Sequence, residues 1–356
     1  MNNDLQSSDL FPEIRIEPVA PKKRAVRSSK AAASSTPAAS SVFTPLAAPA
    51  PVLASPAAAA ETMAVTLEAH PDYRVLRRLK PCVQWPQGAA QGVIRIVVLD
   101  TETTGLDQSK DKIMELALLR VDVDTATGLP VGEVQVYDGL EDPGMPIPKE
   151  VVAITGITDA DVQGQRLDED RIAQLLDGVD VVIAHNAGFD RPFCEARLPR
   201  FRQLNWACSF ADIDWKAQGR GSAKLENLAQ ALGLFYDAHR AEMDCHALLA
   251  VLVAPLPAES HTGLAHLLKA AKKPTYRLQA TNAPFDAKDK LKARGYRWNA
   301  DQKVWHTRTD DELALQLECD WLKANVYQRS AVVQVEKLDS AVKYSSRAGE
   351  VLHRQL

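Results

Sequence analysis

The stretch Val93-Ile94-Arg95-Ile96-Val97-Val98-Leu99-Asp100-Thr101-Glu102-Thr103-Thr104-Gly105-Leu106 decides the fold. Its first part is a nearly continuous β-branched and aliphatic run, which predicts a central strand buried on both faces. The run ends in two carboxylates, and because side chains alternate along a strand, Asp100 and Glu102 leave from the same face. Charge at the end of a buried strand is costly unless it is paired or bound to a cation. Asp100 could instead merely cap a loop, so partners elsewhere in the chain have to decide.

Length, charge and cysteine usage narrow the class of protein. The chain has 356 residues and a net charge of −4, so it is long enough for more than one domain. Its five cysteines are scattered and show no CxxC spacing, which argues against a disulfide framework or a structural zinc site. The N-terminus does not resemble a signal peptide, and no apolar run reaches the ~18 residues of a membrane span. These features predict a soluble, cytoplasmic protein without a membrane partner.

Composition and periodicity divide the chain into five segments. Residues 1–65 are rich in Ala, Pro and Ser and are predicted to be a disordered tail, with a basic cluster at 21–30. Residues 66–90 are a lead-in segment with one expected helix at 73–80. Residues 91–255 alternate between strand and helix patterns, which predicts an α/β domain with a mixed sheet flanked by helices. Residues 256–273 are predicted to be a linker or a helix, and residues 274–356 a small C-terminal α+β domain.

Two further carboxylates fall where an α/β fold would bring them to the first pair. Asp190 follows a buried strand at 179–184, the position where α/β sheets place their sites. Asp244 lies on the apolar stripe of a predicted helix at 241–253. Asp190 could also cap a helix, and Asp244 could pair with an arginine. If the four converge, each like-charged pair at 4 Å costs roughly 4 kcal/mol at an effective dielectric near 20. Divalent cations relieve such repulsion, and Mg²⁺ or Mn²⁺ suits carboxylate ligands.

His239 precedes Asp244 by five residues. That spacing corresponds to about 140° on an ideal helix, so the two side chains cannot share a helical face. His239 is therefore predicted to lie in the loop before the helix, where it suits a mobile proton acceptor. A lone loop histidine is usually only a surface residue, but its spacing to a buried aspartate favours the functional interpretation.

Three segments together carry a family resemblance. DTETTGL at 100–106, HNAGFD at 185–190 and HRAEMD at 239–244 resemble, in order, the three exonuclease motifs of the DEDDh superfamily. Within it they look most like the proofreading (epsilon) subunits of bacterial DNA polymerase III and their stand-alone relatives. The His-x4-Asp spacing is typical of the histidine branch. The resemblance covers roughly residues 93–254 and implies a ribonuclease H-like fold with a mixed five-stranded sheet.

The resemblance also implies roles for single residues. Asp100, Glu102 and Asp244 would hold a first metal ion, Asp100 would bridge to a second, and Asp190 would contribute through water. The two ions, about 3.5–4 Å apart, would clamp the attacking and leaving oxygens, and His239 would be the general base. Segment 150–157 resembles the family's segment near the 3′ hydroxyl, although a threonine at 155 replaces the epsilon histidine. The implied substrate-binding residues are Thr103, Leu106, Glu150, Thr155, His185, Asn186 and Phe189.

The C-terminal segment is basic and contains interleaved aromatic residues. Between Lys269 and Arg308 there are eleven Lys and Arg and three Asp, a net charge of +8. This composition is typical of single-stranded nucleic-acid binding, in which cations neutralise phosphates and aromatic rings stack on bases. The aromatic residues could equally form the core of a small domain. They are Tyr276, Phe285, Tyr296, Trp298 and Trp305.

Together these patterns predict a 3′→5′ exonuclease that uses two divalent cations, Mg²⁺ or Mn²⁺, and releases nucleoside monophosphates from DNA. Its expected partner is nucleic acid with a free 3′ end, single-stranded DNA in the first instance, while a DNA polymerase or repair partner is left open. One alternative is an exoribonuclease that trims RNA 3′ ends. Another is a non-catalytic nucleic-acid binding or adaptor protein, against which the intact set of four carboxylates and His239 speaks.

Overall fold

A computed structural model describes residues 56–87 and 92–356. Residues 1–55 of the predicted tail, including the basic cluster at 21–30, lie outside the described residues. Residues 56–65 were assigned to the same tail, but they belong to helix α1 (Pro56–Glu68), so the prediction of disorder is wrong there. Their alanine-rich sequence favours a helix, and Arg77 forms ion pairs with Glu61 and Glu68 of α1 at 2.8 and 2.6 Å.

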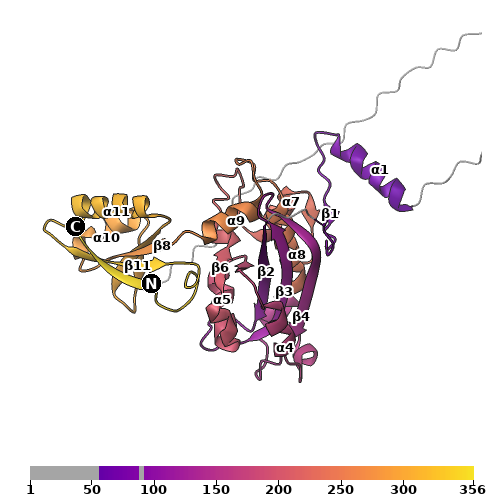
Figure 1. Ribbon diagram of the computed structural model, residues 1–356, viewed down its shortest axis with the longest axis horizontal. Helices are drawn as coiled ribbons and strands as arrows, with labels where there is room; N and C mark the ends of the chain where they lie inside the picture. Colours follow the sequence, from indigo (N-terminus) through magenta and orange to yellow (C-terminus); the bar gives the residue numbers. More distant parts are fainter. Residues whose placement is uncertain (1–55, 88–91) are drawn as a thin grey trace, which may run out of the picture. The chain divides into compact units, whose positions relative to one another are not determined.

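A five-stranded mixed sheet in the order β4-β3-β2-β5-β6 forms the centre of the α/β part (Figure 1). Strands β2 to β4 make the predicted antiparallel meander, and β5 and β6 are added in parallel beside β2. The predicted fold class, a mixed five-stranded sheet flanked by helices, is confirmed. The strands are β2 (Val93–Thr103), β3 (Ile113–Asp124), β4 (Leu129–Leu140), β5 (Val181–Ala184) and β6 (Asn205–Cys208).

Helices cover both faces of this sheet and form two hydrophobic layers. The helices of this part are α2 (Lys149–Thr155), α3 (Asp159–Val162), α4 (Glu169–Leu175), α5 (Ala187–Arg197), α6 (Ser209–Asp212), α7 (Leu225–Ala231), α8 (Ala241–Val253) and α9 (Gly263–Ala271), with a 3-10 turn η1 (Pro199–Gln203).

None of the helices in the described ranges is long and apolar enough to cross a membrane. The cytoplasmic location stays a prediction.

Alternate side chains of β2 enter different layers, and this alternation positions the site. Ile96 and Val98 pack in the hydrophobic layer that contains α8. Val97 and Leu99 pack in the other layer, which contains α4 and α5. Because the period of a strand is two residues, Asp100 and Glu102 continue the face that carries α8. Thr101 between them continues the face that carries α5.

Two segments outside the sheet can be compared with their predictions. The helix expected at 73–80 is wrong, since Arg77–Arg78 form a short strand β1 that pairs in parallel with β7 (Leu234–Phe235). Of the two alternatives for 256–273, a linker or a helix, the structure has the helix, α9. Leu264 and Leu267 of α9 are fully buried in the same hydrophobic cluster as α8. The α/β part therefore continues to the end of α9.

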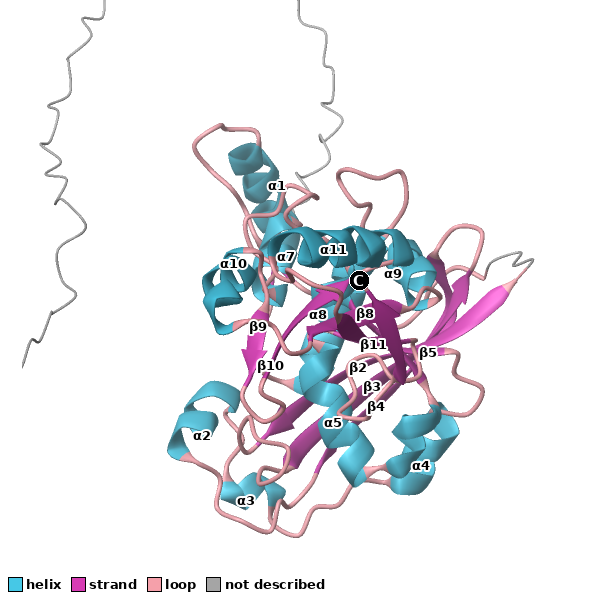
Figure 2. Ribbon diagram, turned by 90° about the vertical axis from the view of Figure 1, so that its left-hand side faces the viewer, coloured by secondary structure: helices cyan, strands magenta, loops and turns pink. Residues whose placement is uncertain are grey.

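The C-terminal segment forms a second, entirely antiparallel sheet in the order β12-β11-β8-β10-β9 (Figure 2). Its core is separate from the cores of the first sheet and contains residues of α10 and α11. The predicted hairpin is present as β9 and β10, while β12 is a strand that sequence reasoning missed. The elements are β8 (Thr275–Ala280), η2 (Phe285–Ala287), α10 (Lys288–Ala293), β9 (Arg297–Asn299), β10 (Val304–Thr309), α11 (Glu312–Asn325), β11 (Val332–Leu338) and β12 (Glu350–Gln355).

Most of the aromatic residues of this segment are structural. Tyr276 and Tyr296 are buried in the core of the second sheet, and Trp305 packs against that core. Only Phe285 and Trp298 expose large apolar surfaces, with 82% and 50% of their areas accessible. Base stacking across this whole aromatic set is therefore excluded.

Candidate active site

Three of the four predicted carboxylates converge at the end of β2. Asp100 and Glu102 leave β2 on the face that carries α8, and Asp244 lies in the first turn of that helix. One carboxylate oxygen from each of the three can be chosen so that all lie within 4.8 Å of one another. The three residues are half-buried, so the group is reachable from solvent. Such an all-oxygen donor set fits a hard divalent cation.

Asp190 lies next to this group but approaches it from the other layer. It is in α5, only 2% of its surface is exposed, and it is not among the three residues whose oxygens converge. One of its oxygens, Oδ1, accepts hydrogen bonds from the Thr101 hydroxyl at 2.8 Å and the Thr101 N–H at 3.2 Å. Thr101 thus connects Asp190 to the strand between Asp100 and Glu102.

The electrostatics of the four carboxylates are those of an uncompensated anionic site. Burial, and then the charges of Asp190 and Asp244, hold the pKa of Asp100 well above its usual range. Burial, with Asp244 as the next cause, raises the pKa of Glu102 to about 8. Burial also raises the pKa of Asp190 to about 7 and that of Asp244 above its usual value. Within residues 56–87 and 92–356, no lysine or arginine forms an ion pair with any of the four.

These pKa shifts predict how the stability of the metal-free protein depends on pH. Between pH 4.5 and about 8 the folded protein keeps the Glu102 proton that the unfolded chain has released, so this group lowers stability as the pH rises. We expect the melting temperature in chelator to fall by several degrees between pH 5 and 8. Mn²⁺, which has to displace these protons, should raise the melting temperature more at pH 8 than at pH 6.

Thermal unfolding of the wild type and of Glu102→Gln, each with chelator and with Mn²⁺, checks this expectation. Glutamine removes the titrating group, so the difference between the two proteins isolates Glu102 from all other titrations. An identical pH dependence of the two metal-free proteins would contradict the role assigned to this carboxyl.

His239 lies in the loop before α8, as its spacing to Asp244 predicts. It is exposed and has a left-handed backbone, with φ of 65°. Its N–H donates to Asp244 Oδ2 at 2.8 Å, and the N–H of Arg240 donates to the same oxygen at 3.2 Å. Asp244 therefore fixes the loop backbone, while the imidazole makes no hydrogen bond within the described part of the chain.

Two residues that sequence reasoning missed hold this loop and Asp244 in place. The Tyr236 hydroxyl donates to Asp244 Oδ1 at 2.9 Å. Glu115 of β3 lies opposite Glu102 and is fully buried, and it accepts from Arg240 at 2.8 Å and from the N–H of the first residue of α8 at 2.9 Å. An acid among the apolar residues at the start of β3 could have revealed Glu115. The sequence around Tyr236 carries no comparable signal.

The predicted substrate-binding residues fall into two groups, and the first is compatible with contact to a ligand. Thr103 closes the turn after β2 with its hydroxyl, and the neighbouring Leu106 exposes 87% of its surface. Asn186 is exposed and left-handed at the start of α5, and Phe189 in the first turn is half-buried. Glu150 is exposed in the first turn of α2.

The side chains of His185 and Thr155 are occupied within the fold. The ring nitrogens of His185 contact the Ser209 hydroxyl at 2.7 Å and the carbonyl of Ala223 at 2.9 Å. Burial lowers the pKa of His185 to about 4, so the ring is neutral. Thr155 is buried, and its hydroxyl donates to the carbonyl of Val151 within α2 at 3.1 Å. The polar atoms of these two side chains therefore serve the loop and the helix, and their predicted contact with substrate stays a prediction.

Residues 97–252 match the RNase_T family model, whose description is Exonuclease. The matched residues include the mixed sheet and the carboxylate group at the end of its central strand, so the similarity to this family lies in the α/β part of the chain.

Individual proteins are similar to the same part of the chain. The PolC-type DNA polymerase III of Thermotoga petrophila is 30% identical over 153 residues, 42% of this chain and 11% of the relative. The DNA polymerase III subunit epsilon of Treponema pallidum is 29% identical over 177 residues, 45% of this chain and 77% of the relative. A solved structure of Exonuclease X in complex with 5′ overhanging duplex DNA is 29% identical, with a TM-score of 0.33, over 44% of this chain and 88% of that one. The chain thus spans about a tenth of the PolC-type relative, and the resemblance of its motifs to epsilon-type exonucleases is confirmed.

Proposed function

We propose that this protein is a metal-dependent 3′→5′ exonuclease that removes nucleoside monophosphates from the 3′ end of DNA. The observation that carries the proposal is the convergence of Asp100, Glu102 and Asp244 within 4.8 Å beside buried Asp190, in a domain that matches the Exonuclease family model. The names of the relatives, DNA polymerase III of the PolC type and its epsilon subunit, support DNA as the substrate.

Asp100, Glu102 and Asp244 would hold a divalent cation, Mg²⁺ or Mn²⁺, and Asp190 would contribute to a second one. Such ions supply stabilisation of the charge that develops on the attacking and leaving oxygens of a phosphodiester. The protein contributes the placement of the ligands. Tyr236 and the two loop N–H groups fix both oxygens of Asp244, and Thr101 fixes Asp190.

His239 would accept the proton of the water that attacks the terminal phosphodiester. Its imidazole is exposed and makes no hydrogen bond to described residues, while its backbone is tied to Asp244. The ring is therefore free to turn toward the substrate without losing a contact, and the loop keeps it beside the carboxylates. Glu115 supports this arrangement through Arg240, which follows His239 directly.

The 3′-terminal nucleotide would lie between the turn after β2 and the start of α5. Leu106 offers an exposed apolar surface for the base, and the backbone at Thr103 lies next to the carboxylate group. Asn186 and Phe189 would line the opposite side. His185 would shape this side from behind through its contacts with the loops at Ser209 and Ala223.

Digestion of labelled oligonucleotides by the full-length protein tests the proposal. DNA and RNA strands of the same sequence, labelled at the 5′ end, are incubated with Mg²⁺, Mn²⁺ or chelator. We expect a ladder that shortens from the 3′ end of DNA, release of mononucleotides, and no reaction in chelator. Digestion of RNA alone would make the protein an exoribonuclease. Strand binding without digestion of either substrate would favour the non-catalytic adaptor.

A further inference from the structure

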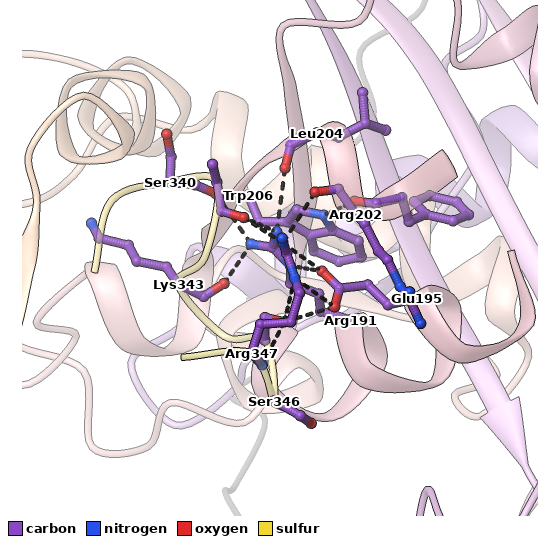
Figure 3. Close-up of polar contacts among 12 residues, drawn as sticks. Arg191, Glu195, Arg202, Leu204, Trp206, Ser340, Lys343, Ser346 and Arg347 are labelled. Carbon is purple, nitrogen blue, oxygen red and sulfur yellow. Dashed lines mark hydrogen bonds and ion pairs between the residues drawn. The ribbon is translucent and has the colours of Figure 1, made fainter. Parts of the chain in front are cut away.

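The connection between β11 and β12 leaves the second sheet and packs on the exonuclease domain. We call residues 339–347 the strap. The N–H of Trp206 in β6 donates to the carbonyl of Ser340 at 2.8 Å, so the strap contacts the edge strand of the first sheet. Fully buried Arg191 of α5 donates to the carbonyls of Ser340 and Lys343 at 3.1 and 2.6 Å, and it also bonds the carbonyl of Ala341 (Figure 3).

A second set of contacts fixes the other end of the strap. Buried Glu195, one turn after Arg191, binds the Arg191 guanidinium at 2.7 Å. The same carboxylate accepts from the Ser345 hydroxyl at 2.6 Å and pairs with Arg347 at 3.1 Å (Figure 3). Both ends of the strap are therefore held by charge-assisted hydrogen bonds, which are stronger than neutral ones.

The strap forms one wall of a cavity of about 630 Å³, which we call the junction cavity. The open face of the second sheet forms the other wall. Tyr276 and Leu278 of β8 belong to the core, so Arg277 between them points to the open face. The lining residues are Gly188, Ala211, Thr275, Arg277, Gly295, Arg297, His306, Thr307, Arg308, Leu338, Val342, Lys343, Tyr344 and Ser345.

The lining of the junction cavity carries cations and no acidic residue. Arg277 pairs with Glu336 at 2.8 Å and Arg308 pairs with Asp212 at 3.0 Å, so their positions are fixed by acids that do not line the cavity. Arg297, in contrast, is exposed and has no ion-pair partner among the described residues.

His306 adds a neutral polar group to the same face. Strand register places it directly opposite Arg297, on the open face of the sheet. Its ring makes no hydrogen bond within residues 56–87 and 92–356. Burial, and then the charges of Arg277 and Arg297, lower the pKa of His306. The cavity thus offers an unpaired guanidinium and a free imidazole, which are donors suited to phosphate oxygens.

The position of the cavity connects it to the candidate active site. Gly188 lines the cavity and lies two residues before Asp190, within the segment proposed to contact the 3′ nucleotide. We propose that the junction cavity binds the sugar–phosphate backbone of the single DNA strand whose 3′ end occupies the active site. This inference rests on the proposed function for the polarity of the strand. It identifies the C-terminal sheet as the part that holds the strand behind its terminal nucleotide.

The chemistry of the lining favours backbone contacts to one strand. Among the described residues, the aromatic rings of the lining are those of Tyr344 and His306, and the cation of Arg308 already lies 5.5 Å from the centre of the Tyr344 ring. Base stacking is therefore a minor contribution, and binding should depend on phosphate charge, be insensitive to sequence and weaken with salt.

Binding and hydrolysis by the double variant Arg297→Ala/His306→Ala test the proposal. We measure affinity by fluorescence anisotropy in chelator, and KM and kcat in Mg²⁺, for a DNA strand of about 20 nucleotides and for a dinucleotide. The expected result is about three- to tenfold weaker binding and a raised KM for the long strand only. The kcat, and the KM of the dinucleotide, whose single phosphodiester is the one to be cleaved, should not change. Arg294→Ala is the matched control, since Arg294 pairs with Glu318 and does not line the cavity.

The outcomes separate this proposal from the proposed function. Equal losses for the long strand and the dinucleotide, or no difference from Arg294→Ala, would overturn the assignment of the cavity while leaving the exonuclease intact. If the wild type binds the long strand through the junction cavity but does not hydrolyse it, the proposed exonuclease function is refuted. The proposed role of the cavity in binding DNA is then retained. Loss of affinity for an acidic peptide but not for DNA would assign the cavity to a protein partner instead.

Discussion

Replacing His239 should lower kcat for removal of the 3′ nucleotide by about 10²–10⁴-fold, the usual contribution of a general base. Two variants separate the loss of the imidazole from a change in the loop backbone. His239→Ala removes the ring, but alanine is strained at the φ of 65° found there. His239→Asn also removes the base, and asparagine tolerates this backbone conformation, so the N–H that donates to Asp244 stays in place. Both variants should lose rate, and the asparagine variant should keep the fold.

Single-turnover hydrolysis and DNA binding in chelator are measured side by side for these variants. Because the imidazole makes no hydrogen bond to the described residues, affinity for DNA should change by less than about twofold. Asp100→Asn serves as the comparison, since it should lose both hydrolysis and the Mn²⁺-dependent rise in melting temperature, whereas the His239 variants keep the latter. Equal losses of rate and DNA affinity in His239→Asn would remove the role assigned to the imidazole.

Replacing Arg191 by alanine should destabilise the protein by about 2–4 kcal/mol, because it removes a buried guanidinium that donates to several carbonyls of the strap at about 1–1.5 kcal/mol for each hydrogen bond. Glu195 loses its partner on α5 but keeps Arg347, so its charge stays compensated. The substitution also removes the guanidinium that stacks on Trp206 at 5.4 Å. For the same reasons, a protein truncated after residue 273 should unfold at a lower temperature than the full chain.

Urea unfolding followed by circular dichroism measures this loss. Arg294→Ala is the control, because Arg294 also pairs with a glutamate but is largely exposed, and it should cost less than about 1 kcal/mol. If Arg191→Ala does not fold, Ser345→Ala removes one hydrogen bond to Glu195 and should cost about 1–2 kcal/mol. A loss below 1 kcal/mol for Arg191→Ala would mean that the strap contributes little to the fold.

The elements that sequence analysis predicted well are those with a single strong pattern. The apolar run of β2 and the apolar stripe of α8 gave these elements with nearly their observed bounds. For the α9 segment the sequence left a linker and a helix open, because its leucines are buried against α8 through a tertiary contact that the local pattern does not report. The strap was missed for a related reason, since polar residues 339–347 are ordered by Arg191 and Glu195, about 150 positions earlier.

In the candidate site, too, local patterns predicted some features, while others depend on tertiary contacts. Alternation along β2 was enough to place Asp100 and Glu102 on one face, and helix periodicity placed His239 in a loop. The internal hydrogen-bond partners of His185 and Thr155 cannot be read from the sequence, because they depend on how the chain folds. Glu115 was overlooked because its role depends on strand register, which brings it opposite Glu102.

Asp190 and Arg191 are neighbours in α5 whose side chains serve different parts of the molecule. Successive residues of a helix diverge by about 100°, so one helix can hold a carboxylate at the end of β2 and a guanidinium under the strap. A fusion protein that carries the α/β part of this chain therefore also needs residues 339–347, which are separate from it in the sequence. A fragment that stops after α9 would leave Arg191 without the backbone oxygens that accompany it here, whereas a fragment grafted together with residues 339–347 would retain them.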